Sequence, residues 1–170
     1  FSNTHFFIGI DVHKKRWGVT IITIELFLKR FSIDPDPGKL INYMRQNYPN
    51  GIYHSVYESG FCGFHIHEKL CEGGFDNIIA HAADVPSTGK EKSCKTDNVD
   101  SSKLARELSK GSLKGIFIPD KYHLTLRGLV RRREDLSKRQ MVIKQKIKSF
   151  LNFTGISLPD ELSHWSGKLI

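Results

Sequence analysis

The chain has 170 residues, 39% of them hydrophobic and 26% charged, which suits one globular domain with a helical extension. No apolar run reaches the ~20 residues of a membrane-spanning helix, and no cleavable signal peptide is visible. The three cysteines form no Cys-x-x-Cys pair, and their odd number argues against a disulfide framework, so we expect reduced thiols as in a cytoplasm.

The net charge of +8 is concentrated in one part of the chain. Residues 1–100 carry 11 Lys and Arg against 12 Asp and Glu, whereas residues 101–170 carry 15 against 6. Such asymmetry favours a polyanionic partner, most often a nucleic acid. The alternative is a basic helix face that contacts only water.

The first half of the chain predicts strands separated by helices. The apolar run at residues 6–10 indicates a buried strand that ends near Asp11. Residues 16–33 are rich in β-branched and aromatic side chains and predict one long strand or two antiparallel ones. Residues 34–48 begin with Asp and Pro residues, which often start a helix, and continue with apolar residues three or four positions apart, so we predict a helix there. A further strand is predicted at 51–59 and is expected to end at Glu58.

The second half continues with a helix at 62–74, a strand at 75–82 and a polar loop at 83–94. A helix to about residue 111 and a short strand at 114–120 follow. This order of elements predicts an α/β domain with a mixed central sheet flanked by helices.

One long basic helix is predicted from residue 121 to about 153. Four of its apolar residues recur every seven positions: Leu129, Leu136, Ile143 and Phe150. A full heptad pattern needs a second apolar row, four residues after the first, but Arg133 and Gln140 occupy positions of that row. The heptad pattern is therefore partial. It is typical of a helix that associates with a second copy or packs on another domain.

Four carboxylates are candidates for a shared site. Asp11 and Glu58 stand at the ends of predicted strands, where ligands of α/β sheets bind, although such acids also cap turns. At 100° per residue, Asp97 and Asp100 lie on the same stripe of their helix as two leucines. This predicts that both acids point inward, whereas acids that only complement the helix dipole would face water.

Four carboxylates directed at one point would repel each other without a cation between them. Oxygen ligands suit Mg²⁺ or Mn²⁺, and two such ions about 4 Å apart are a common device of phosphodiester chemistry. We therefore predict a two-metal site, with the basic last third of the chain holding a nucleic-acid substrate.

The segments GIDVHK, YESG and KTDNVDSSKLAREL, in this order, resemble the three conserved blocks of the DEDD transposases of bacterial insertion sequences. The resemblance covers residues 6–152. It implies an RNase H-like (RuvC-like) domain at 1–120, followed by a basic, coiled-coil-like connecting region at 121–170.

The resemblance also implies a function and its partners. Asp11, Glu58, Asp97 and Asp100 would be the catalytic and metal-binding tetrad, with Mg²⁺ as cofactor, in an enzyme that recombines DNA in the bacterial cytoplasm. A structured guide RNA is an implied partner, and the last helix favours a homo-oligomer. The family's catalytic serine lies in a further C-terminal domain, so we expect this chain, which ends at Ile170, to lack it.

The candidate nucleic-acid contacts form two groups. Lys14, Lys15 and Arg16 follow Asp11, although they could equally be a solvated hairpin tip. The long helix contributes Arg127, Arg131, Arg132, Arg133, Lys138 and Arg139.

Two other functions are compatible with the sequence. A free-standing RuvC-like resolvase would cut four-way (Holliday) junctions without a serine domain. A nucleic-acid-binding or dimerisation module would have no chemistry, and its four acids could be replaced without effect.

Overall fold

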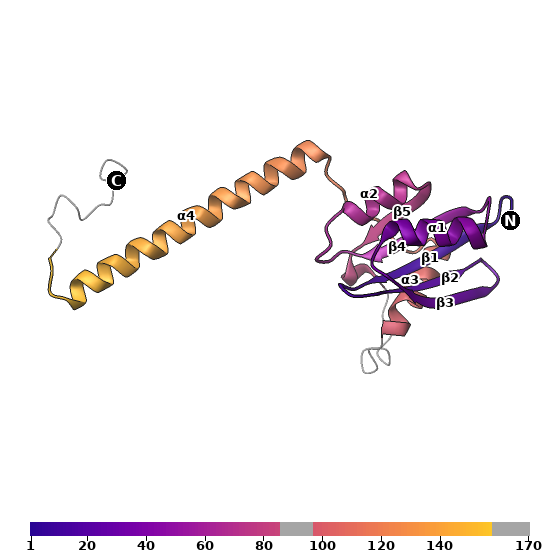
Figure 1. Cartoon of the computed structure of the whole chain (residues 1–170), viewed down its shortest axis with the longest axis horizontal. Helices are drawn as coiled ribbons and strands as arrows, with labels where there is room; N and C mark the ends of the chain where they lie inside the picture. Colours follow the sequence, from indigo (N-terminus) through magenta and orange to yellow (C-terminus); the bar gives the residue numbers. More distant parts are fainter. Residues whose placement is uncertain (86–96, 158–170) are drawn as a thin grey trace. The chain divides into compact units, whose positions relative to one another are not determined.

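A computed structural model describes residues 1–85 and 97–157, without the side chains of residues 97–99 (Figure 1). The predicted loop at 83–94 therefore falls outside the described residues from position 86 onward. The chain divides into two compact units, Phe1–Ile118 and Pro119–Ile170.

The first unit is built on one five-stranded sheet. Its strands are β1 (His5–Val12), β2 (Trp17–Ile22), β3 (Phe27–Ile33), β4 (Ile52–Glu58) and β5 (Phe75–Ala80), in the order β3-β2-β1-β4-β5. β1, β4 and β5 are parallel, whereas β2 runs antiparallel to both β1 and β3. The predicted mixed sheet is confirmed, and residues 16–33 form the two antiparallel strands of a hairpin.

Two helices, α1 (Pro37–Asn47) and α2 (His65–Glu72), pack on one face of this sheet. α1 begins at a capped end: the Asp36 carboxylate accepts a hydrogen bond from the Gly38 amide at 2.7 Å, and proline occupies the first helical position. Leu40, Ile41 and Met44 follow at helical spacing and are buried. The spacing of apolar residues along α1 therefore decides which side of the helix packs against the sheet.

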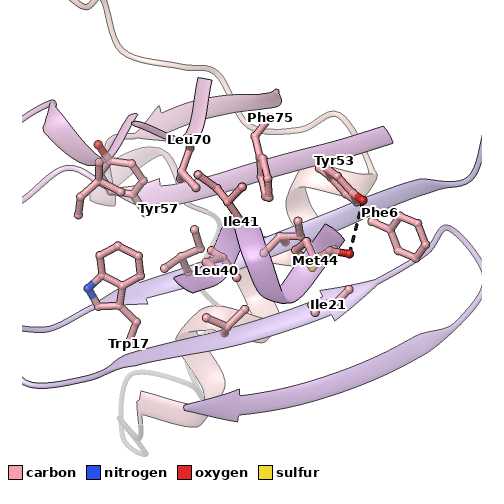
Figure 2. Packing of buried hydrophobic residues seen from close by; sticks show 14 of the residues in the cluster. Phe6, Trp17, Ile21, Leu40, Ile41, Met44, Tyr53, Tyr57, Leu70 and Phe75 are labelled. Carbon is pink, nitrogen blue, oxygen red and sulfur yellow. Dashed lines mark hydrogen bonds between the residues drawn. The ribbon is translucent and has the colours of Figure 1, made fainter. Parts of the chain in front are cut away.

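Figure 2 shows the core between these helices and the sheet. Its largest fully buried side chains include Trp17, Tyr57, Leu40 and Leu70. Burial of each large apolar side chain contributes roughly 1.5–3 kcal/mol, so this layer supplies much of the driving force for folding. Tyr53 closes one end of the core, where its hydroxyl donates to the Tyr48 carbonyl at 2.6 Å.

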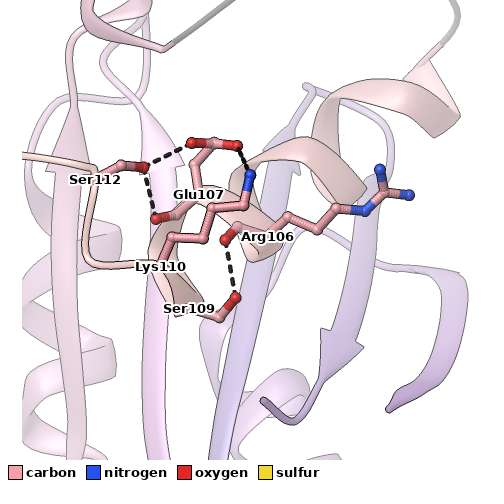
Figure 3. A network of polar contacts seen from close by, with 5 residues as sticks. All are labelled: Arg106, Glu107, Ser109, Lys110 and Ser112. Atoms are coloured by element: carbon pink, nitrogen blue, oxygen red, sulfur yellow. Dashed lines mark hydrogen bonds and ion pairs between the residues drawn. The ribbon is translucent and has the colours of Figure 1, made fainter. Parts of the chain in front are cut away.

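A third helix, α3 (Asp97–Ser109), covers the opposite face of the sheet, against β1, β2 and β4. Leu104 and Ala105 are buried there. The helix ends in a polar network in which Glu107 binds Lys110 and the hydroxyl of Ser112, each at 2.7 Å (Figure 3). Gly111, with φ of 68°, supplies the left-handed residue that ends the helix.

The strand predicted at residues 114–120 is wrong. Gly115 forms a bridge to Ala80, and the Ile116 amide donates to the Ile79 carbonyl at 2.8 Å, but the described residues form no longer ladder here. Pro119 has no amide hydrogen and cannot extend such a ladder.

The second unit consists mainly of one helix, α4 (Lys121–Phe153), as predicted. Asp120 caps its start by accepting a hydrogen bond from the His123 amide at 2.8 Å. No residue of α4 is buried within the described part of the chain. Among the described residues, no helix combines the length and apolar character that crossing a bilayer requires.

Candidate carboxylate site

Asp11 lies near the carboxyl end of β1, within the strand rather than after it. Ile8 and Ile10 point into the core beneath α1 and α2, so strand alternation places Gly9 and Asp11 on the face that α3 covers. The side chain of Asp11 is 16% exposed, and its Oδ2 atom lies 3.0 Å from Nε2 of His13. This carboxylate is therefore largely buried and paired with an imidazole.

Glu58 is the last residue of β4, the parallel neighbour of β1. The final paired residues of the two strands are Ile10 and Tyr57, and Asp11 and Glu58 are the residues that follow them. Val56 packs with Leu104 of α3, so alternation places Glu58 on the α3 face as well. The sheet thus brings both acids to one edge and one face, where Glu58 is exposed to solvent.

Asp100 lies in the first turn of α3 and is partly buried. The next residue, Ser101, is fully buried against the sheet. The buried stripe of α3 runs through Ser101, Leu104 and Ala105, which places Asp100 at its margin. Asp97 begins the helix, but its side chain lies outside the described residues, so its inward orientation stays a prediction.

The carboxylates of Asp11, Glu58, Asp97 and Asp100 are the groups that could bind a divalent metal ion here. Carboxylate oxygens are the ligands that Mg²⁺ and Mn²⁺ prefer, and Asp11 and Glu58 lie at the carboxyl ends of adjacent strands. Across residues 1–85 and 100–157, no three His, Cys, Asp or Glu side chains lie close enough together to hold a metal ion. The donor chemistry fits such an ion, whereas the complete tetrad stays a prediction.

His13 is a site residue that sequence reasoning missed. The Asp-x-His spacing puts residues 11 and 13 on the same side of an extended chain, which was the available signal. An imidazole hydrogen bond restricts the rotation of the Asp11 carboxylate.

The predicted basic residues after Asp11 are all exposed. Lys14 has a neighbour that sequence reasoning also missed: its Nζ atom lies 5.8 Å from the centre of the Phe61 ring, which is 63% exposed. Phe61 follows Glu58 by three residues, so a cation and an aromatic ring lie in the loops after the two acid-bearing strands. Lys15 and Arg16 complete this exposed group.

The basic residues predicted on α4 are likewise exposed: Arg127, Arg131, Arg132, Arg133, Lys138 and Arg139. Arg139 forms an ion pair with Asp135 at 2.9 Å. On a helical wheel, Arg132 and Arg133 flank the row that begins with Leu129 and Leu136. Their contact with nucleic acid stays a prediction.

The chain has structural neighbours among solved proteins. Two structures of Thermus thermophilus RuvC, one of them in complex with Holliday junction substrate, match it at 9–10% identity. They have TM-scores of 0.43 and 0.47, and the match covers 65–66% of this chain and 99% of theirs. The observed strand order, with β2 as the antiparallel member, is the RNase H-like (RuvC-like) arrangement that we expected.

A comparison with curated proteins found no match. The comparison with protein families is decisive: the model of the DEDD transposases of the IS110 group, described as "Transposase", matches residues 8–156. This match begins within β1, includes Asp11, and spans β4, α3 and the whole of α4. The chain therefore belongs to the IS110 family of DEDD transposases.

Proposed function

We propose that this chain cuts and joins DNA strands during transposition, with Asp11, Glu58, Asp97 and Asp100 as the catalytic carboxylates. One observation supports the proposal: Asp11 and Glu58 lie at the carboxyl ends of neighbouring parallel strands, on the face covered by the helix that carries the other two acids. Family membership supports transposition over the resolvase and binding-module alternatives.

The four acids would hold Mg²⁺ or Mn²⁺. When bound, the metal would activate the attacking oxygen and neutralise charge on the scissile phosphate. The protein fixes the donors in advance, because Asp11 and Glu58 belong to hydrogen-bonded strands and Asp11 is oriented by His13. Burial of Asp11 lowers the local dielectric and so strengthens its attraction for a cation.

Nucleic acids would contact two basic surfaces. Lys14, Lys15 and Arg16 lie in the loop after the first acid, where they can hold the phosphates on either side of the cut. The arginines and lysines of α4 supply further phosphate contacts, for DNA and for a structured guide RNA. The exposed apolar row of α4 would join two copies of the chain, and a serine-bearing domain would complete strand exchange.

Cleavage of DNA by the purified chain tests the proposal. We expect nicking of supercoiled and branched DNA with Mg²⁺ or Mn²⁺ but not with EDTA, and its loss in Asp11→Asn. His81→Asn, in a side chain that caps a short turn after β5, is a matched control. Symmetric cutting confined to four-way junctions would favour a resolvase, and activity unaffected by Asp11→Asn would refute the carboxylate site.

A further inference from the structure

A chain of hydroxyl groups joins α3 to the sheet next to Asp100. The Thr20 hydroxyl of β2 lies 2.9 Å from the Ser101 hydroxyl and 3.1 Å from that of Ser102. Thr20 and Ser101 are fully buried and Ser102 is 4% exposed. From the neighbouring strand β3, Arg30 donates to the Ser102 hydroxyl through Nη2 at 2.5 Å.

The arginine fixes the direction of the first hydrogen bond in this chain. Because a guanidinium only donates, Ser102 accepts from Arg30. Ser102 can then donate to Thr20, and Thr20 to Ser101. Each hydroxyl in this order accepts one bond, and removal of one member leaves a buried neighbour with an unmet bond.

A glycine brings the two elements into direct backbone contact at the same level of the sheet. Gly9 is the Cα partner of Thr20, and Thr20 in turn is the partner of Arg30. A Cβ atom on Gly9 would lie 2.0 Å from the Ser101 carbonyl oxygen and 2.6 Å from the Ala105 nitrogen. No side chain fits there, so the backbone of α3 rests directly on β1, two residues before Asp11.

Another part of α3 packs on the sheet through apolar side chains. Leu104 packs with Val56, Ala80 and Val85. Apolar contacts are not directional and tolerate small rotations of a helix. Hydrogen bonds require a defined distance and angle, and the β-branched Thr20 has a restricted χ1 angle that fixes its hydroxyl.

We propose that Thr20 is a positioning residue for the catalytic carboxylate of Asp100. Through Ser101 and Ser102 it sets the rotation of the first turn of α3 over β1, and with it the place of Asp100 relative to Asp11. This inference rests on the proposed function, because it assumes that Asp100 binds the metal. It assigns a role to a buried hydroxyl outside the carboxylate motifs.

Two substitutions separate this role from simple packing. Thr20→Val keeps the shape and removes the hydroxyl, whereas Thr20→Ser keeps the hydroxyl. We expect Thr20→Val to weaken Mn²⁺ binding about 10-fold, the usual effect of losing a group that orients a ligand, and Thr20→Ser to restore it. Thr23→Val, in the β2–β3 turn, removes a hydroxyl that hydrogen-bonds to the backbone of Leu26 in the same hairpin, and this variant should bind Mn²⁺ like the natural sequence.

Mn²⁺ affinity is measured on the whole chain by electron paramagnetic resonance titration, well below the thermal transition of each variant. Amide hydrogen exchange is recorded in parallel and should be faster in α3 of Thr20→Val, with α1 unchanged. If Thr20→Val does not fold, Ser101→Ala provides the same test, since alanine suits a helix.

The outcomes are distinct. Unchanged Mn²⁺ affinity and unchanged exchange in α3 would overturn the positioning role. Weaker binding that Thr20→Ser does not restore would also overturn it, because the hydroxyl would then be irrelevant. A natural sequence that binds no Mn²⁺ would refute the proposed function instead, and the exchange of α3 in Thr20→Val would still decide whether the hydroxyl fixes the helix.

Discussion

Asp11 and Glu58 are 47 positions apart in the sequence, yet they lie side by side at the carboxyl ends of two adjacent parallel strands. The last residues that pair β1 with β4 are Ile10 and Tyr57, and Asp11 and Glu58 are the next residue of each strand. Strand alternation puts both on the face where α3 packs. Like charges brought together in this way raise the free energy of the folded chain, and a cation between them would offset that cost. This relationship is the basis of the first prediction.

Replacing one acid of this pair should remove function without loss of stability. We expect Glu58→Gln to lower metal-dependent DNA cleavage at least ~100-fold, since it removes a metal-binding oxygen. The free energy of unfolding without metal should stay the same or rise by up to ~1 kcal/mol, as charge repulsion falls. Urea unfolding and a nicking assay on the same preparation measure both quantities. A marked loss of stability would show that Glu58 has a structural role.

The arginines that flank the apolar row of α4 should contribute to nucleic-acid affinity through charge alone. Replacing Arg132 and Arg133 by Gln should weaken binding and reduce the slope of log K against log salt by about 1 for each lost phosphate contact. Arg139→Gln should have a smaller effect, because Arg139 already pairs with Asp135. Fluorescence anisotropy of labelled DNA over a range of salt concentrations measures the slope. Equal slopes for all variants would place the nucleic acid elsewhere.

Glu107 should make the stability of the first unit depend on acid pH. Its hydrogen bond to Lys110, with a second to Ser112, holds the pKa of this carboxyl below its ordinary value. A lowered pKa in the folded state stabilises the fold above the ordinary value, and this stabilisation is lost as the pH falls through the folded pKa. Glu107→Gln should therefore reduce the free energy of unfolding at pH 7 by at most about 1 kcal/mol, with a smaller difference below about pH 4.

The measurement for Glu107 is chemical denaturation from neutral to acid pH. Glu25→Gln, at the exposed β2–β3 turn, is the control and should leave the profile unchanged. The prediction would be contradicted if the difference in the free energy of unfolding between Glu107→Gln and the natural sequence became larger as the pH falls.

The apolar row of α4 should mediate self-association. Leu129, Leu136, Ile143 and Phe150 are 53–64% exposed, and apolar side chains at this seven-residue spacing are typical of a helix that packs against another helix. We expect the chain to form oligomers in light-scattering chromatography, and the double variant Leu136→Glu, Ile143→Glu to be monomeric. Met141→Glu changes a residue of similar exposure on another side of the helix and should leave the oligomer intact. A monomeric natural chain would refute this prediction.

The sequence by itself determined most of the elements and the residues worth testing. Apolar runs and helical spacing identified β1, β4, β5 and the four α-helices, since side chains repeat every 2 residues in a strand and every 3.6 in a helix. They left open whether residues 16–33 form one strand or the two that are observed, β2 and β3. The sequence also identified Asp11 and Glu58 as strand-end acids. It failed at residues 114–120, where the segment makes one bridge to the edge strand β5 and Pro119 has no amide hydrogen with which to extend the pairing.

Only the tertiary structure decided which residues meet. The pairing of β1 with β4 places Asp11 beside Glu58, and the contact between Gly9 and Ser101 seats α3. The hydroxyl chain through Thr20 joins residues 81 positions apart. Such contacts follow from strand order and helix placement, which depend on the burial of the whole core rather than on any local period.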